Sequence, residues 1–260
     1  NTLKIIKAYF RRETLNLLSL NVMEKEEDFL KIEKDSFTVV FTNAENGRSF
    51  NRNTETGINE LNSLKNKFSV KDVVYLKQIH SDKILNYKLG ENDFNSNEGD
   101  SIVTDEREVI IGVFTADCVP IILVDDTKGV AAAIHSGWRG TFESITFKTV
   151  EKMKSEFGCE DINIKAFIGP HIRQCCYEIS EELKNKFLEK KKMINPEILF
   201  EKRNLNLEAC IVQDLKESGL RDENINSLNL CTHCSEEIKL HSYRKSDGAY
   251  GRMFAFVILH

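Results

Sequence analysis

The sequence has little proline and no long apolar run. Only 3 of its 260 residues are proline, and no stretch rich in serine, glycine or proline divides the chain. A flexible linker is therefore not expected, and we predict a single domain over residues 1–260. The longest apolar runs, such as residues 109–114, have the length of a strand. They are far shorter than the roughly 18 to 20 residues that a membrane-spanning helix needs, so we expect no membrane partner.

The sequence also lacks an excess of basic residues. Its formal net charge is -5, so no basic surface is expected that would attract nucleic acid or an anionic membrane. The first stretch, residues 1–20, shows neither the compact apolar block nor the small-residue cleavage site of a secretory signal. The 7 cysteines are odd in number and scattered, unlike a disulfide framework. We therefore expect a soluble, cytoplasmic protein whose cysteines are reduced thiols or metal ligands.

Short segments rich in β-branched residues predict the strands. They lie at 37–41, 72–76, 109–114, 120–124, 129–135, 162–168 and 254–259. Most show no alternation of apolar and polar residues, which indicates strands covered on both faces. The two segments on either side of "DDTKG" predict an antiparallel hairpin. The asparagine-rich residues 89–100 are expected to form a surface loop.

Three further stretches predict helices. Residues 142–157 have apolar side chains every three or four positions, with Thr141 as N-cap and Gly158 just past the end. Residues 178–194 and 206–220 are amphipathic and are expected to cover a sheet. The predicted fold class is therefore α+β: a layered sandwich of mixed, largely antiparallel β-sheet covered by helices.

Two histidines and a cysteine stand near predicted strand ends. His80 lies in "QIHSDKI", Cys118 in "FTADCVP" and His135 in "AAAIHSGWRG". A side chain at a strand end, beside a glycine or proline turn, can face a cleft. Taken singly, each residue is explained better by packing in the core. If the three converge, two imidazoles and a thiolate leave the fourth position of a tetrahedral zinc free for water or substrate.

Six motifs in a fixed order resemble those of one protein family. They cover residues 78–260 and read "QIHSDKI", "GDSIVTD", "TADCVPIILVD", "AAAIHSGWRGT", "IGPHIRQCCYEI" and "CTHCSEEIKLHSYRKSDGAYGR". The sequence resembles the YfiH-type laccase-domain family, first called polyphenol oxidases and now regarded as purine nucleoside phosphorylases with adenosine deaminase activity. The resemblance implies a catalytic zinc held by His80, Cys118 and His135. It also implies adenosine, inosine, guanosine or methylthioadenosine as substrates, together with inorganic phosphate.

The stretch "SGWRGT" suits an anion site. Gly137 and Gly140 allow a close approach of the backbone, and Arg139 offers a fork of hydrogen-bond donors. A helix beginning after Thr141 would add free N–H groups at its positive end. The alternative for Arg139 is an ion pair that braces the loop.

The N-terminal third departs from the family pattern. Relatives usually have an arginine where this sequence has Ala44. If that arginine binds phosphate in relatives, this protein has either lost it or replaced it with Arg48 or Arg52. At the other end, the stretch "SYRKSDGAYGR" offers either substrate contacts or the surface of a homodimer through Tyr243, Arg244 and Arg252.

The remaining cysteines and Asp117 have open roles. Cys231 and Cys234 have the spacing of a zinc site, with Cys175 and Cys176 as the other half. Adjacent residues seldom bind one ion together, so we expect packed thiols instead. Asp117 is a candidate proton shuttle, but strand alternation points it away from its neighbour Cys118 and favours a structural role.

Three other functions compete with this interpretation. Copper is a second candidate metal, because two histidines and a cysteine also bind blue copper. The 6 histidines of the chain, however, cannot supply a trinuclear copper cluster as well, which argues against a laccase mechanism. A metal-free alternative is a thiol hydrolase or deamidase with Cys118 as nucleophile and His135 as base. The third alternative is a non-catalytic module that binds a small molecule or a protein, which binding of purines without turnover would favour.

Overall fold

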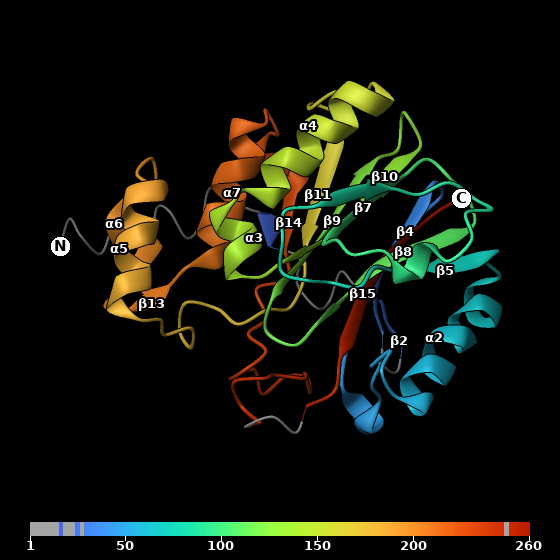
Figure 1. The fold of residues 1–260 in the computed structure, drawn as a ribbon, viewed down its shortest axis with the longest axis horizontal. Helices are drawn as coiled ribbons and strands as arrows, with labels where there is room; N and C mark the ends of the chain where they lie inside the picture. The colour runs from blue at the N-terminus through green and yellow to red at the C-terminus, as the bar shows by residue number, and fades with distance from the viewer. Residues whose placement is uncertain (1–15, 18–23, 27–28, 247–249) are drawn as a thin grey trace.

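Two β-sheets lie face to face in the computed structural model, which describes residues 16–17, 24–26, 29–246 and 250–260 (Figure 1). The seven-stranded sheet has the order β1 (Asn16–Leu17), β14 (Ile225–Ser227), β11 (Ile164–Ile168), β9 (Val119–Asp125), β10 (Val130–Ser136), β7 (Ser101–Thr104) and β6 (Ile84–Asn86). The six-stranded sheet has the order β2 (Glu24–Glu26), β3 (Phe29–Lys34), β4 (Phe37–Thr42), β15 (Met253–Leu259), β8 (Val109–Thr115) and β5 (Asp72–Val74). A short pair, β12 (Phe200–Glu201) and β13 (Asn204–Leu205), forms a third sheet. The prediction that residues 1–20 form no secretory signal concerns a stretch of which the structure describes only residues 16–17.

Strand pairing is mostly antiparallel. β9 and β10 form the predicted hairpin, with Leu123 opposite Ala132. The parallel pairs lie toward the edges of the sheets, where β14 pairs with β1 and β11, β5 with β8, and β6 with β7. The predicted α+β class, with its mixed and largely antiparallel sheet, is therefore confirmed.

The central strands are buried on both faces. In β10, Ala133 faces the other sheet while Ala132 faces the helices. In β15, Val257 lies between the sheets while Phe256 faces the outer side of the six-stranded sheet. Because neighbouring side chains of a strand point to opposite faces, both sets must be apolar. This double burial explains the unbroken apolar runs in the sequence.

Helices cover the outer faces of both sheets. The α-helices are α2 (Glu55–Phe68), α3 (Trp138–Phe142), α4 (Ile145–Phe157), α5 (Glu181–Lys190), α6 (Pro196–Leu199) and α7 (Leu207–Glu217). The 3-10 turns are η1 (Glu45–Gly47), η2 (Phe94–Ser96) and η3 (Asp222–Asn224). α4 and α7 pack on the seven-stranded sheet, and α2 lies on the opposite side of the molecule (Figure 1). Within the described residues, no helix is both long and apolar enough to cross a bilayer.

The sequence predicts α5 and α7 but not α2. α5 and α7 both fall inside the predicted ranges 178–194 and 206–220. α2 buries the side chains of Leu61 and Leu64 and is as amphipathic as α5 and α7, so its periodicity was sufficient to predict it. Its start is also marked, because the Thr54 hydroxyl accepts a hydrogen bond of 3.1 Å from the Gly57 N–H.

The helix predicted over residues 142–157 begins earlier and is broken. α3 starts after Gly137, and Thr141 lies inside it rather than at an N-cap, with its hydroxyl 2.8 Å from that of Ser136. Ser144, with a φ of 57°, separates α3 from α4. Gly158 ends α4 as predicted, with a φ of 67°.

A buried polar group holds this break. The Ser144 hydroxyl lies 2.6 Å from Lys191 Nζ and 3.1 Å from Asp214 Oδ1, and the lysine and the carboxylate lie 3.0 Å apart. A buried ion pair needs such additional hydrogen bonds to offset its desolvation. A tertiary contact, which local periodicity cannot reveal, therefore accounts for the break between α3 and α4.

Candidate metal centre

The structure brings His80, Cys118 and His135 together. Their ligand atoms all lie within 4.8 Å of one another, and Cys118 Sγ is 3.9 Å from His80 Nε2. The two imidazole rings meet edge to face, with centroids 4.8 Å apart. His135 lies in β10 and Cys118 immediately precedes β9, near the predicted strand ends. His80 instead lies in the loop between β5 and β6.

Asp100 orients the two histidines. One of its carboxylate oxygens lies 2.8 Å from His135 Nδ1 and accepts a hydrogen bond of 3.0 Å from the His80 N–H. The other oxygen accepts from the N–H and the hydroxyl of Ser81, at 2.6 and 2.7 Å. With Nδ1 of His135 occupied in this way, its Nε2 is left to face the centre. A carboxylate behind a histidine is the usual outer partner of a metal ligand.

Asp100 was not among the residues predicted for the site. It ends the stretch 89–100 that was predicted to be a surface loop, yet its side chain is 0% exposed. Phe94 is also buried, so the prediction is wrong for this part of the stretch. The available signal was the position of Asp100 in the motif "GDSIVTD", directly before β7.

Gly137 makes room for the ligands. A Cβ at this position would lie 2.9 Å from His80 Cδ2 and 3.1 Å from Cys118 Sγ. Both distances are tighter than ordinary van der Waals contact. The glycine that the sequence assigns to phosphate therefore serves the packing of the centre. Gly140 similarly approaches the Ser81 carbonyl oxygen, which a Cβ would meet at 3.2 Å.

Without a metal, Cys118 and His135 shift each other's pKa. Burial raises the pKa of the Cys118 thiol, but His135 and then His80 outweigh burial and lower this pKa to about 6. Burial lowers the pKa of His135, but the Cys118 thiolate and the Asp100 carboxylate outweigh it and raise this pKa to about 9. At neutral pH the pair is therefore a thiolate and an imidazolium. A cation that takes the place of the imidazolium proton finds a thiolate already formed.

A cavity of about 510 Å³ opens beside the three ligands. Its volume falls in the range of small-molecule sites. Arginine and aromatic side chains supply much of its wall, from segments far apart in the sequence: Arg52, Arg139, Arg244, Arg252, Phe114, Trp138, Tyr177, Tyr243 and Tyr250. Tyr243, Arg244 and Arg252, for which the sequence left a substrate or a dimer role open, thus line the cavity.

The candidate phosphate residues separate into two groups. Arg139 lies at the cavity, exposed and stacked 4.5 Å from the Trp138 ring centroid. Among the described residues, no carboxylate forms a salt bridge with it, so the bracing ion pair is not seen. Arg48 does not line the cavity, because its Nε donates a hydrogen bond of 2.6 Å to Glu60 on α2. Of the two arginines considered in place of the one expected at Ala44, Arg52 lines the cavity.

Asp117 lies beside the cavity in a structural role. One carboxylate oxygen accepts a hydrogen bond of 2.6 Å from the Thr232 hydroxyl, and the other accepts one of 2.8 Å from the Arg244 N–H. Both oxygens are thus already engaged, which favours a structural role. Strand alternation is not the reason, because Asp117 and Cys118 lie between β8 and β9 and both line the cavity. Asp117 thereby ties the C-terminal segment to the turn that carries Cys118.

The fold and this site define a class of protein: a two-sheet α+β domain with a His–Cys–His centre at the wall of an arginine-rich cavity. The chain belongs to the multi-copper polyphenol oxidoreductase laccase family, which matches residues 37–260. It is 46% identical over 230 residues to a purine nucleoside phosphorylase of Clostridium acetobutylicum, covering 88% of this chain and 95% of that protein.

Two further comparisons agree with this membership. Over 194 residues the chain is 32% identical to adenosine deaminase RL5 from an unknown prokaryotic organism, covering 70% of this chain and 73% of that protein. The crystal structure of the Bacillus licheniformis hypothetical protein YfiH superposes with a TM-score of 0.83 and 25% identity, covering 92% and 100% of the two chains. The family resemblance carried by the six sequence motifs is confirmed.

Asp100→Asn is expected to weaken metal binding at this centre by about 10- to 100-fold, because the histidines lose their charged outer partner. The amide keeps the size of the side chain but cannot accept from His135 and Ser81 through both oxygens. Competition with a chromophoric chelator measures the affinity. The matched control is Asp82→Asn, which removes an exposed carboxylate that pairs with Lys148. Equal affinities for the wild type and the Asp100 variant would contradict the assigned role.

Alkylation should report the lowered pKa of Cys118. In chelator-treated protein, we expect iodoacetamide to modify Cys118 readily at pH 7 and more slowly as the pH falls through about 6. An ordinary thiol would lose reactivity already below about pH 8.5. Peptide mass spectrometry separates Cys118 from Cys175, whose pKa is raised to about 11, chiefly by burial. A midpoint for Cys118 above pH 8 would contradict the charge pairing.

Proposed function

We propose that this protein is a zinc-dependent purine nucleoside phosphorylase that also deaminates adenosine. The observation that carries the proposal is the meeting of His80, Cys118 and His135 at the wall of a cavity that arginine and aromatic side chains also line. The names of the relatives from Clostridium acetobutylicum and of RL5 support the two activities. Inosine, guanosine, adenosine and methylthioadenosine are the proposed nucleosides.

The donor set fits zinc. Two imidazoles and a thiolate are borderline to soft ligands, and three protein ligands leave one tetrahedral position for water or substrate. When bound, zinc supplies Lewis-acid activation of water near neutral pH. Copper is the second candidate for the same donors. The trinuclear cluster of a laccase has no counterpart among the described residues, where His80 and His135 are the only histidines in a metal-ligand group.

Phosphorolysis needs an anion site on one side of the sugar. Inorganic phosphate attacks ribose C1′ as the bond from C1′ to the purine nitrogen breaks, which yields a free purine and ribose 1-phosphate. Positive charge develops on the sugar, so phosphate must be held close to it. Arg139 and Arg52 line the cavity and are proposed to bind phosphate through paired N–H donors.

The aromatic side chains suit the purine. Tyr177, Tyr243 and Tyr250 line the cavity and present flat apolar surfaces on which a base can stack. Burial, and then the nearby Cys118, raises the pKa of Tyr177 to about 12, so its phenol stays protonated at neutral pH. A protonated phenol can donate a hydrogen bond to the purine as negative charge develops on it.

Deamination differs in its second substrate. Water replaces the amino group at C6 of adenosine, and inosine and ammonia are released. Because this reaction uses no phosphate, the arginines that bind phosphate are not required for it. A mutation of Arg139 is therefore expected to separate the two activities.

Product analysis tests the proposal. Purified protein is incubated with adenosine, inosine or methylthioadenosine, with and without phosphate, and the products are separated by chromatography. We expect free purine only when phosphate is present, and inosine from adenosine in both conditions. Binding of nucleosides without any product would favour a binding module instead.

A thiol hydrolase or deamidase is the second candidate, and the thiolate–imidazolium pair of Cys118 and His135 favours it. The two proposals respond oppositely to zinc. Added zinc should protect Cys118 from iodoacetamide and support activity if the protein is a phosphorylase. It should inhibit a thiol hydrolase, because the nucleophile would be occupied.

The single domain over residues 1–260, the homodimer and the cytoplasmic location stay predictions. Light scattering of the purified protein measures the oligomeric state directly. A mass near one chain would contradict the homodimer without affecting the proposed chemistry, because the described residues of one chain supply the three ligands and the cavity wall.

A further inference from the structure

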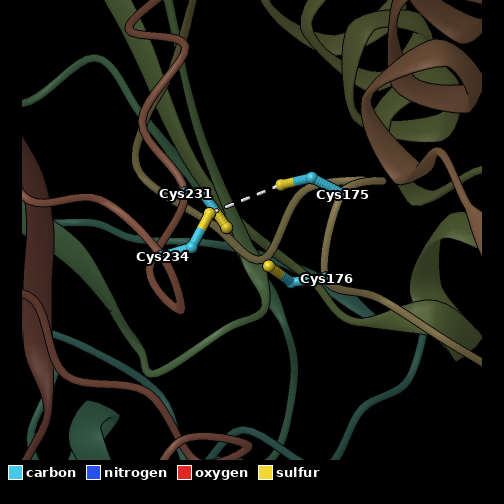
Figure 2. Close-up of side chains that lie close together, drawn as sticks. All are labelled: Cys175, Cys176, Cys231 and Cys234. Atoms are coloured by element: carbon cyan, nitrogen blue, oxygen red, sulfur yellow. Dashed lines mark hydrogen bonds between the residues drawn. The ribbon is translucent and has the colours of Figure 1, made fainter.

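Four cysteines from two distant turns meet outside the metal centre. Cys175 and Cys176 lie in the loop after β11, and Cys231 and Cys234 lie in the turn after β14. Their sulfur atoms all lie within 4.8 Å of one another, and those of Cys175 and Cys234 are 3.6 Å apart. Figure 2 shows the four side chains directed toward a common centre. The sequence favoured packed thiols here because adjacent cysteines seldom share an ion.

The backbone explains how adjacent cysteines face the same point. The N–H groups of Cys176 and Tyr177 both donate to the Arg173 carbonyl oxygen, at 2.9 and 3.0 Å, so the chain turns tightly at this position. In the other turn, the Ser235 N–H donates to the Cys231 carbonyl oxygen at 3.0 Å and closes the loop around the second cysteine pair.

Backbone contacts hold the two turns against each other. His171 and Cys231 form a parallel β-bridge, in which the Thr232 N–H donates to the His171 carbonyl oxygen at 3.0 Å. The His171 N–H donates to the Leu230 carbonyl oxygen at 3.2 Å. The four sulfurs are thus positioned by the main chain, independently of any bond between them.

The distances suit a single ion. Zinc binds thiolates at about 2.3 Å, so the sulfurs of a tetrahedral site are about 3.8 Å apart. The sulfurs of Cys175 and Cys234, 3.6 Å apart, are already close to this value, and all four sulfurs lie within 4.8 Å of one another, so small side-chain adjustments suffice. A cluster of several iron atoms would hold at least some of its cysteine sulfurs farther apart, because those sulfurs bind different irons.

The surroundings also suit a bound cation. Cys231 is buried, whereas Cys175 and Cys234 are exposed, so one side of the cluster is open to an entering ion. Four ligands from the protein leave no position for substrate, as in a structural site.

We propose that Cys175, Cys176, Cys231 and Cys234 bind one structural zinc ion that braces the wall of the cavity. Tyr177 follows Cys176 and lines the cavity. Thr232 follows Cys231 and donates to Asp117, the residue next to Cys118. An ion that joins the two turns would therefore fix one wall of the cavity from behind. This second site does not depend on the identity of the metal held by His80, Cys118 and His135.

Metal analysis of the full chain tests this proposal. The protein is produced in zinc-containing medium, kept reduced and dialysed, and its metals are measured by mass spectrometry. We expect about two zinc ions per chain in the wild type and about one in Cys175→Ser or Cys234→Ser. Cys159→Ala is the matched control, because this buried cysteine belongs to neither cluster and should leave the zinc content unchanged.

Cobalt distinguishes the two sites and does not require the cysteine variants to fold. In His80→Ala loaded with cobalt, the remaining ion should show the strong visible bands and the sulfur-to-metal charge transfer of a four-thiolate site. Retention of all zinc in Cys175→Ser, or loss of all cobalt bands in His80→Ala, would overturn the proposal. A disulfide between Cys175 and Cys234 in the reduced preparation would also overturn it. Failure of the nucleoside assays would leave these metal readouts unaffected.

Discussion

Cys118→Ala is expected to remove about one zinc ion per chain and to abolish both phosphorolysis and deamination. The centre has three protein ligands and no redundancy, so two imidazoles remain when the thiolate is lost. The loss of affinity should exceed the roughly 10- to 100-fold that removal of an outer partner costs. His80→Ala and His135→Ala should behave alike, because each removes one of the same three ligands.

Zinc content and product formation are measured on the same preparation of Cys118→Ala. Cys159→Ala is again the control, because it removes a buried thiol away from the centre. Full zinc content in Cys118→Ala would remove this residue from the ligand set. Loss of zinc with full activity would show that the reactions do not need the metal.

Arg139→Ala is expected to raise the phosphate concentration needed for inosine cleavage by about 10- to 100-fold. The estimate corresponds to the loss of a charge-assisted contact of roughly 1.5–3 kcal/mol. Arg139 lines the cavity and, among the described residues, has no competing ion pair, so its donors are available to an anion. Deamination of adenosine should change much less, because it uses no phosphate, and zinc content should stay unchanged.

Arg48→Ala is the contrasting variant for this experiment. Its guanidinium pairs with Glu60 and does not line the cavity, so the phosphate requirement should stay close to that of the wild type. Arg52→Ala tests the other candidate at the cavity wall. Equal loss of phosphorolysis and deamination in Arg139→Ala would assign that side chain to bracing the loop instead. A phosphate requirement changed only by Arg48→Ala would place the anion site in the N-terminal segment.

The fold could be predicted largely from local patterns. Unbroken apolar runs such as residues 109–114 indicated strands buried on both faces, and the hairpin turn set the antiparallel pairing of β9 and β10. The failures have tertiary causes. Ser144 breaks the predicted helix because it contacts the buried pair of Lys191 and Asp214, which lie on segments far along the chain.

The candidate site was predicted less completely. The ordered motifs pointed to His80, Cys118 and His135, and the structure places them together. Asp100 was missed because its burial depends on contacts with residues 79–81 and 135, which composition does not reveal. Spacing alone could not show that the two cysteine pairs meet, because a β-bridge between distant segments aligns their turns.

Phosphorus magnetic resonance during the reaction of inosine with inorganic phosphate tests the central claim most directly. The signal of ribose 1-phosphate should grow at the rate at which hypoxanthine forms and inorganic phosphate disappears. It should be absent with Cys118→Ala protein. Hypoxanthine formed without the sugar phosphate signal, or a wild-type preparation loaded with zinc that leaves inosine and phosphate unchanged, would contradict the proposed phosphorylase.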